Sequence, residues 1–513
     1  MAAPRPYPPA TAWLTAVPDG RIVSGEVPPP TAVCADSRAI VPGALFVALP
    51  GFETDGHRFL RDAIARGATA LLVQEDHQAD WEPFVAEANV AIVAAPDTRA
   101  ALAPVAAAFH GHPALKLGMI GVTGTDGKTT TVHLIAHVLE AAGRPAGYLS
   151  SAAFRATSGE ARTNDSHMTT LEAPFVQQQL AAMVDAGRDY AVVEASSHGL
   201  ALHRVDACAF DVAVFTTLSR DHLDFHKTMQ AYRDAKARLF RMLDEAPPPP
   251  GVTKAAVVNA GDSEANYFLA QTSAPPMTYA IDGPADVRAD RIEAVGLGTR
   301  FRLITQHGTA GVSIRLAGRY NVSNCLAAAA VAASQGVALT DIVRALETFP
   351  GVPGHLELID EGQPFRVIID IASTPEALRR VLETMRSATA GQLIAVLGCA
   401  GERDPARRTG MGRVAAELAN FAVLTNEDPR REDPDTIIEE IAGALRANGR
   451  EEGRDFARVP DRREAIRAAF ARAQPGDTVL LAGKGVEPSI VIGAQAIPWN
   501  EAQVAREELR ELR

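Results

Sequence analysis

Apolar runs and helical patterns alternate along most of this chain. Runs of strand length lie at 190–196, 211–218 and 254–261. After residue 365 the alternation returns, and apolar residues at three- and four-residue spacing predict helices over 375–388, 410–419, 435–446 and 461–473. Strands that alternate with helices in this way form mostly parallel sheets whose two faces are covered by helices. The pattern therefore predicts an α/β fold.

Turn-rich segments divide this pattern into three blocks, as the length of 513 residues suggests at ~150 residues for each domain. Residues 1–112 open with a proline-rich stretch and predict a small α/β domain. Residues 113–350 begin with an apolar strand, a glycine-rich turn and a helix, which is typical of the parallel sheet of a phosphate-loop ATPase. Residues 351–513 predict a Rossmann-like, doubly wound domain, in which ligands bind beyond the carboxyl ends of the strands.

Composition narrows the classes of function. Acidic residues outnumber basic ones by 62 to 50, giving a net charge of −12, whereas a general nucleic-acid binder would show a basic excess. The four cysteines form no CxxC motif, which disfavours a disulfide scaffold and a zinc site. No segment has the features of a signal peptide or reaches the ~18 apolar residues of a membrane helix. We therefore expect a cytoplasmic protein without nucleic-acid or membrane partners.

The stretch GVTGTDGKTTT, residues 121–131, has the form of a phosphate-binding loop. A strand, a glycine turn and a helix here would direct backbone N–H groups and the helix N-terminus at phosphate. Lys128 would reach the β- and γ-phosphates, and the Thr129 hydroxyl would bind Mg2+. Five residues separate Gly121 from Gly127, whereas the generic template has four. An ordinary glycine-rich turn is the alternative, but the flanking strand and helix favour a nucleotide site.

Residues further along the chain are candidates for a metal site. Glu194 ends a predicted strand, where its carboxylate would either hold Mg2+ beside the loop or face solvent. His222 and His226 flank an acidic turn, but zinc needs at least one more ligand than this pair. Lys236 lies on a predicted helix, and a lone lysine there usually faces solvent. The residues alone thus predict no more than a candidate site for a hard metal.

Taken together, these motifs resemble the Mur ligase family, whose members use ATP to add amino acids to the peptidoglycan precursor. The family's loop has the form GxTGTxGKTT, with the additional residue found here. The segments EASSH, LSRDHLDFH, YRDAKARLF, GRYNVSN and VLGCAGERD follow in the family's order, so that the resemblance spans essentially the whole chain. The early segment ADSRAIVPGALFVALPGFETDGHRF, with TNEDPRREDP and AGKGVE, is similar to the member that joins a diamino acid to UDP-N-acetylmuramoyl-L-alanyl-D-glutamate.

The resemblance implies three domains with separate tasks. The first would bind UDP, the second ATP and the third the incoming amino acid. In the implied reaction, ATP phosphorylates the side-chain carboxylate of the D-glutamate, and the amine of the diamino acid then displaces phosphate. We expect a monomer that acts on these small molecules.

The resemblance also assigns roles to individual residues. The implied catalytic group is Lys128, Glu194, His222 and Lys236. Two Mg2+ ions would be held by Thr129, Glu194, His222 and Lys236, the last carrying a CO2-derived carbamate. The implied ATP contacts are Gly124, Thr125, Gly127, Lys128, Thr129, Thr130, Asn321 and Asp370. The implied contacts to the UDP-muramoyl-dipeptide are Ser37, Gly51, Asp55, Gly56, Thr169, Thr170, Ser196 and Arg204, and those to the amino acid are Arg403, Asp428, Arg430, Gly483 and Glu487.

The chain departs from the family pattern at positions around these sites. Asp126 stands where the family usually has Asn, and His355 stands where it usually has Arg. Ser373 and Val486 each stand where the family usually has His. The segment 427–430 reads EDPR, whereas members that add meso-diaminopimelate have DNPR. Arg430 could pair with the distal carboxylate of diaminopimelate, but the Asp428 carboxylate could instead attract the ammonium of a lysine or ornithine substrate. We favour meso-diaminopimelate, with L-lysine and L-ornithine as the alternatives.

Three other functions are compatible with parts of the pattern. A ligase of the same superfamily that adds glutamate to folate shares the loop and the modified lysine, but it would have no use for the first domain. A degenerate member that binds the muramyl nucleotide as a sensor or scaffold would account for the changes around ATP, although the five residues expected to bind phosphate and metal are all present. A kinase or motor ATPase would need a different arrangement of the second metal.

Overall fold

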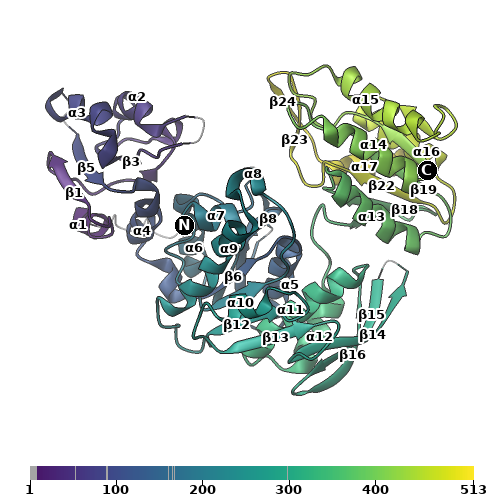
Figure 1. Ribbon diagram of the computed structural model, residues 1–513, viewed down its shortest axis with the longest axis horizontal. Helices are drawn as coiled ribbons and strands as arrows, with labels where there is room; N and C mark the ends of the chain where they lie inside the picture. Colours follow the sequence, from purple (N-terminus) through teal and green to yellow (C-terminus); the bar gives the residue numbers. More distant parts are fainter. Residues whose placement is uncertain are drawn as a thin grey trace.

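The computed structural model describes residues 9–51, 54–87, 90–159, 161–164, 166, 168–296 and 298–512. Among the described residues, three large sheets follow one another along the chain, with a further two-stranded sheet near its end, and in Figure 1 the first and third large sheets stand on opposite sides above the central one. The predicted α/β fold with three successive units is confirmed, whereas the boundaries at residues 112 and 350 stay predictions. Within the described part of the chain, no helix combines the length and the apolar character needed to cross a membrane.

The first sheet is a small, mostly parallel one. Its elements are α1 (Ala10–Leu14), β1 (Arg21–Ser24), β2 (Val33–Cys34), β3 (Leu45–Val47), α2 (Leu60–Ala65), β4 (Ala70–Gln74), α3 (Gln78–Glu87), β5 (Ala91–Ala95) and α4 (Thr98–Phe109). The strands lie in the order β1-β5-β4-β3-β2, and only β1 runs antiparallel to its neighbour. Helices α1 and α4 cover one face, and α2 and α3 cover the other.

The central sheet carries the phosphate loop. Its elements are β6 (Gly118–Thr123), α5 (Lys128–Ala141), β7 (Ala146–Leu149), β8 (Ala153–Arg155), β9 (Arg162–Thr163), α6 (Ala173–Asp185), β10 (Tyr190–Glu194), α7 (Ser197–Ala201), β11 (Val212–Phe215), α8 (Leu223–His226), α9 (Met229–Arg241), β12 (Ala255–Asn259), α10 (Ala265–Leu269), β13 (Pro276–Ala280), β14 (Val287–Val295), β15 (Gly298–Thr305), β16 (Gly308–Ile314), α11 (Arg319–Ser334) and α12 (Leu339–Thr348). Strand β6 lies between β10 and β11 and runs parallel to both. Helices α5, α11 and α12 cover one face, and α6, α9 and α10 cover the other, so that every residue of β6 is buried.

Both edges of the central sheet differ from the parallel pattern expected. At one edge, the short strands β8 and β9 pair antiparallel beyond β7. The other edge differs more. Strands β14, β15 and β16 pair antiparallel and extend the sheet beyond β13. Buried and exposed residues tend to alternate along β15 and β16. This alternation is typical of antiparallel strands with one solvated face, and a search for continuous apolar runs overlooks such strands.

The third sheet repeats the doubly wound arrangement. Its elements are β17 (Glu357–Ile359), β18 (Arg366–Asp370), α13 (Pro375–Ala388), β19 (Leu393–Leu397), α14 (Ala406–Leu418), β20 (Phe421–Leu424), α15 (Pro434–Ala447), β21 (Phe456–Arg458), α16 (Arg462–Arg472), β22 (Thr478–Ala482) and α17 (Glu501–Glu511). Between β22 and α17, β23 (Ser489–Ile492) and β24 (Gln495–Pro498) pair antiparallel as a separate two-stranded sheet. The strands lie in the order β17-β18-β22-β19-β20-β21, between α13, α14 and α15 on one face and α16 and α17 on the other. The predicted helix at 375–388 coincides with α13, whereas α14 begins four residues before the predicted 410.

Helix α17, which the sequence pattern did not predict, is joined to the third sheet by a buried ion pair. Arg462 and Glu501 have side-chain exposures of 1% and 0%, and Nη2 lies 2.6 Å from Oε1. The guanidinium also donates to the backbone oxygens of Asn426 and Ala482, at 3.2 and 2.9 Å. The pair thereby connects α16, α17 and the carboxyl ends of β20 and β22.

We predict that Glu501→Ala destabilises the third sheet by about 3–5 kcal/mol, because it leaves the buried Arg462 charge without its paired carboxylate. The free energy is read from amide hydrogen exchange of the strands of that sheet. Glu507→Ala is the matched control on the same helix. Its ion pair with Arg463 is more than a third exposed on both sides, so its removal should cost less than about 1 kcal/mol. Equal effects of the two substitutions would contradict the role given to the buried pair.

Candidate nucleotide and ligase site

The phosphate loop is held in shape by the strand beside it. The Thr125 N–H donates to the Thr217 carbonyl at 2.7 Å, and the Thr216 hydroxyl donates to the Asp126 carbonyl at 2.6 Å. Gly124 has a φ of +147°, and a Cβ there would lie 1.9 Å from the Thr216 hydroxyl oxygen, so that only glycine fits. Helix α5 begins at Lys128, directly after the loop, and its N-terminal N–H groups therefore point at the space where phosphate would bind.

Oxygen donors converge next to the loop. The Thr129 hydroxyl lies 3.1 Å from both carboxylate oxygens of Glu194, which is 2% exposed and ends β10 beside β6. Ser151 completes the group, since its N–H donates to Glu194 at 2.8 Å and its hydroxyl lies 2.8 Å from that of Thr129. Hydroxyl and carboxylate oxygens are the ligands that Mg2+ prefers. The sequence reasoning missed Ser151, although its position just after a buried strand is a usable signal.

Lys236 does not face solvent, as a lone helical lysine usually does. Its side chain on α9 is 1% exposed, and Nζ donates to the Gly124 carbonyl at 2.6 Å. Nζ also lies 4.4 Å from the centre of the Tyr232 ring. Burial, with the nearby charge of Lys128, holds the pKa of Lys236 well below its usual range. The amine therefore sits directly beneath the phosphate loop in a site that disfavours its charged form.

The histidines expected near Lys236 gather around the same tyrosine. The His222 ring lies 6.0 Å from the Tyr232 ring and 4.8 Å from the His198 ring. His226 is buried, and this burial together with the neighbouring His198 lowers its pKa to about 4. Among the described residues, no cluster of three metal-binding side chains includes His222 or His226. In the part of the chain that the structure describes, the two histidines therefore lack the further ligand that zinc would need.

A cavity of about 670 Å³ opens beside the loop, between the central and third sheets. Loop residues 125–130, Asn321 on α11 and Asp370 at the end of β18 all line it, which brings the predicted ATP contacts other than Gly124 to one space. The departures Asp126, His355 and Ser373 line it as well. Val486 does not; its backbone N would lie 2.8 Å from a Cβ at Gly354. The lining residues that sequence reasoning missed include Tyr320 and Arg380, since each reaches the cavity only through the tertiary fold.

The predicted dipeptide contacts lie on the other side of Glu194. The Thr170 hydroxyl is 2.8 Å from the Glu194 carbonyl and 3.0 Å from the Ser196 hydroxyl. Arg204 donates to the Thr170 carbonyl at 2.9 Å and pairs with Glu172 at 2.7 Å. Thr169 immediately precedes this group in the chain. The nucleotide and dipeptide sets thus meet at one carboxyl edge of the central sheet.

The predicted UDP contacts belong to the first sheet. Ser37 is buried at the start of a short 3-10 turn, and Gly51, Asp55 and Gly56 follow β3. A Cβ on Gly56 would lie 2.7 Å from the Leu49 nitrogen, which excludes larger residues. Phe52 and Glu53, within the predicted turn 51–57, lie outside the described residues.

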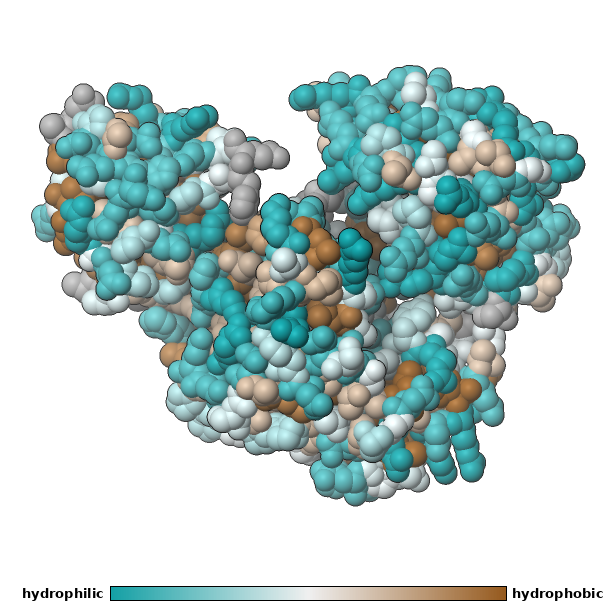
Figure 2. All heavy atoms as spheres, in the orientation of Figure 1, coloured by the Kyte–Doolittle hydropathy of each residue, from teal (hydrophilic) through white to brown (hydrophobic). Residues whose placement is uncertain are grey.

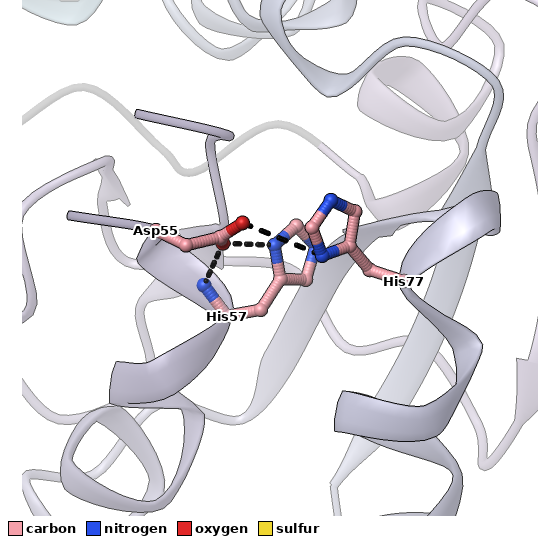
Figure 3. Close-up of side chains that lie close together, drawn as sticks. All are labelled: Asp55, His57 and His77. Atoms are coloured by element: carbon pink, nitrogen blue, oxygen red, sulfur yellow. Dashed lines mark hydrogen bonds and ion pairs between the residues drawn. The ribbon is translucent and has the colours of Figure 1, made fainter. Parts of the chain in front are cut away.

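Asp55 is held by two stacked histidines (Figure 3). Its carboxylate accepts from the His57 backbone N–H at 2.8 Å, and lies 2.7 Å from His57 Nδ1 and 3.4 Å from His77 Nδ1. The Gln74 N–H donates to His57 Nε2 at 3.0 Å, so Nε2 is the acceptor and Nδ1 carries the proton. Neither nitrogen of His57 is therefore free to bind a metal, and the cluster instead fixes the turn against the end of β4.

The predicted amino-acid contacts surround a buried lysine that sequence reasoning missed. Lys484 Nζ lies 2.9 Å from Asp428 Oδ1 and 2.5 Å from Glu487 Oε2. The same Asp428 oxygen accepts from the Val491 N–H at 2.9 Å. A Cβ on Gly483 would meet the Glu427 carboxyl at 2.9 Å, and burial raises the pKa of that carboxyl to about 8. Arg403 lies on the adjoining turn, where the Gly401 N–H donates to the Asp428 carbonyl at 2.8 Å.

Of the predicted groups of contact residues, some lie together in the structure and one lies apart. The predicted nucleotide and dipeptide contacts adjoin each other at Glu194. Arg99 of α4 links the first sheet to them, since it donates to the Pro50 carbonyl at 2.6 Å and interacts electrostatically with Glu172 and Arg204. The amino-acid set lies on the third sheet. Figure 2 shows an open space between the first and third domains above the central one.

Family models match consecutive parts of this chain. They describe a Mur ligase family catalytic domain over residues 30–110, a Mur ligase middle domain over 122–332 and a Mur ligase glutamate ligase domain over 354–485. A UDP-N-acetylmuramyl-tripeptide synthetase from Roseiflexus sp. (strain RS-1) is 47% identical over 488 residues, which are 94% of each chain. The chain belongs to the Mur ligase family.

Further Mur ligases match over almost the full length. A UDP-N-acetylmuramoyl-L-alanyl-D-glutamate–2,6-diaminopimelate ligase from Geobacillus thermodenitrificans (strain NG80-2) is 40% identical over 98% of this chain and 99% of its own. A solved structure with the same ligase name has a TM-score of 0.65 and 30% identity, covering 96% of this chain and 97% of its own. Mur ligases are ATP-dependent ligases, so the expected resemblance is confirmed.

Proposed function

We propose that this Mur ligase adds a diamino acid to UDP-N-acetylmuramoyl-L-alanyl-D-glutamate in peptidoglycan precursor synthesis, through an acyl phosphate. The observation that carries the proposal is the meeting of two sets of residues at Glu194. Its carboxylate faces Thr129 of the phosphate loop, and its backbone carbonyl accepts from Thr170 of the dipeptide set. An ATP on the loop and a carboxylate held by the dipeptide set would therefore be neighbours, as phosphoryl transfer between them requires.

The roles of this chain's residues follow from their positions. Lys128 and the N-terminus of α5 bind the phosphates and offset their charge, while Thr170, Ser196 and Arg204 hold the acceptor. The D-glutamate side-chain carboxylate attacks the γ-phosphorus of ATP, and ADP leaves. The amine of the diamino acid then attacks the acyl carbon and phosphate leaves. Positioning and charge compensation supply most of the catalysis in such a reaction.

Two Mg2+ ions fit the donor groups to different degrees. Thr129 and Glu194 supply hard oxygen ligands as they stand. Lys236, whose buried amine has no oxygen, suits a hard metal together with His222 only as the carbamate formed from its neutral amine and CO2. Bound Mg2+ would neutralise charge on the transferring phosphoryl group.

The contacts of Asp428 favour meso-diaminopimelate as the added residue. Lys484 pairs with this carboxylate as well as with Glu487, so the Asp428 carboxylate already has a cationic partner, which weakens its attraction for the ammonium of lysine or ornithine. Among the described residues, the Arg430 guanidinium has no side-chain partner. A free guanidinium matches the distal carboxylate of diaminopimelate, because the two can form paired hydrogen bonds.

Two subsidiary proposals concern the setting of the reaction. We infer a cytoplasmic monomer, whose substrates are small molecules. The separate position of the amino-acid set also suggests that movement of the third domain toward the central one completes the site. The alternative function is a non-catalytic sensor, which the changes at Asp126, His355 and Ser373 in the nucleotide cavity favour.

We predict that the purified protein releases phosphate from ATP only when the muramoyl-dipeptide nucleotide and one diamino acid are both present. Coupled phosphate-release assays with meso-diaminopimelate, L-lysine and L-ornithine in parallel would identify the diamino acid. Diaminopimelate should give the highest kcat/KM. Absence of turnover with all three, in a protein that binds the muramoyl nucleotide, would replace the ligase by the sensor.

Lys236→Ala should lower kcat by about 100-fold, the loss typical when a metal-site partner is removed. Acetate or formate should restore part of the activity, because a free carboxylate can replace the carbamate. Lys128→Ala is the control: its lost function is a positive charge, which a carboxylate cannot replace. Wild-type activity in Lys236→Ala, or equal rescue of both variants, would contradict the carbamate.

Arg430→Gln should raise the KM for meso-diaminopimelate by about 10- to 100-fold, the range expected for a lost hydrogen bond to a charged group, while the KM for ATP stays unchanged. Arg431→Gln, an exposed neighbour, serves as the matched control and should leave both constants near their wild-type values. A diaminopimelate KM that is the same in both variants would remove Arg430 from the amino-acid site.

A further inference from the structure

The phosphate loop is tied to the third domain by one ion pair. Asp126 Oδ2 in the loop lies 2.9 Å from Arg380 Nη1 on α13, and both side chains are about half exposed. Both residues line the cavity of about 670 Å³ beside the loop. Asp126 is also the position at which the loop departs from the usual Asn.

The Asp126 carboxylate cannot easily move away from the nucleotide space. Its backbone is fixed on both sides, since its carbonyl accepts from the Thr216 hydroxyl at 2.6 Å and the preceding Thr125 N–H donates to Thr217. Its charge reaches into the site, where it acts on Lys236 and Tyr232. A triphosphate on this loop would therefore lie close to an additional negative charge.

Close to Arg380, helix α13 also contacts the central domain through Thr384. The Thr384 hydroxyl, one turn further along α13, donates to the Arg380 carbonyl at 2.7 Å. Thr384 also interacts with the phenol of Tyr320 on α11. The helix thus presents Arg380 to the loop next to its contact with α11 of the central domain.

Arg380 is one of few positive charges that line the cavity. Among the described lining residues, only Lys128 and Arg380 carry a permanent positive charge, and Asp126 and Asp370 oppose them. Ser373 and His355 stand where the family pattern has His and Arg, so neither restores a permanent cation. Without Arg380, the protein's own charges here would be negative before any phosphate arrived.

We propose that Arg380 is a positioning residue that offsets the charge of Asp126, so that docking of the third domain and nucleotide binding strengthen each other. This inference rests on the proposed nucleotide site. Arg380 can neutralise Asp126 only while α13 is docked, and the loop accepts phosphates best when Asp126 is neutralised. Coupling of this kind is reciprocal, so bound nucleotide must favour the docked position by the same factor.

The test is a double-mutant cycle on the full chain, with the Kd of MgATP measured by calorimetry. Arg380→Gln should raise the Kd by about fivefold in the native background, at the lower end of couplings between sites. In the Asp126→Asn background, where no charge needs to be offset, the same change should alter the Kd by less than about twofold. Arg380→Lys should retain most of the native affinity, because it keeps the charge.

The matched control is Arg379→Gln on the same helix. Arg379 pairs with Glu383 and Glu417 instead of with the loop, and its removal should leave the Kd unchanged in both backgrounds. Small-angle X-ray scattering gives a second measurement: MgATP should compact the native protein more than it compacts Arg380→Gln.

Each other outcome overturns the inference in a recognisable way. An equal loss of affinity in both backgrounds would mean that Arg380 binds the nucleotide itself. No loss of MgATP affinity in either background would mean that the Asp126–Arg380 pair has no effect on nucleotide binding. Failure of the native protein to bind MgATP would remove the nucleotide site, and with it the proposed ligase function. If the native protein binds MgATP and turns over normally, but the effects of the Asp126 and Arg380 substitutions on the Kd simply add, only this inference would be overturned and the ligase function would stand.

Discussion

The hydrogen bond from Lys236 to the Gly124 carbonyl is the contact on which the site depends. It connects the buried face of α9 to the centre of the phosphate loop, and the loop in turn positions Lys128, Thr129 and the N-terminus of α5. The cost of burying an amine is lowered when the group is neutral, which agrees with the depressed pKa of Lys236. The side chain that supports the loop is thus the same one on which the proposed carbamate would form.

Parallel strands explain why residues so distant in sequence meet here. Strands β6, β10 and β11 end side by side, so their following loops supply the glycine turn, Glu194 with Ser196, and Thr216 with Thr217. The third sheet contributes Asp370 in the same manner, from the carboxyl end of β18. A ligand in the cavity between the two sheets would therefore contact residues at the strand ends of each.

Local patterns were sufficient for most of the fold and for part of the site. The loop, Glu194 at a strand end and helix α13 could all be predicted, since each depends on residues close in sequence. Arg380 and Lys484 could not, because an arginine on a helix and a lysine between glycines acquire meaning only from partners that the tertiary fold brings near. The burial of Lys236 was missed for the same reason, and β14–β16 because alternating strands lack a continuous apolar run.

The buried pair of Arg462 and Glu501 affects the order in which the protein matures during synthesis. Arg462 on α16 precedes β22, the strand between β18 and β19, and its counter-charge Glu501 follows only after β22, β23 and β24. The third sheet therefore cannot enclose the Arg462 guanidinium together with its paired carboxylate until nearly the whole chain has been made. The residues of the central sheet all precede this point in the chain, whereas the third sheet, which carries the residues proposed to select the amino acid, needs α17 to complete its buried ion pair.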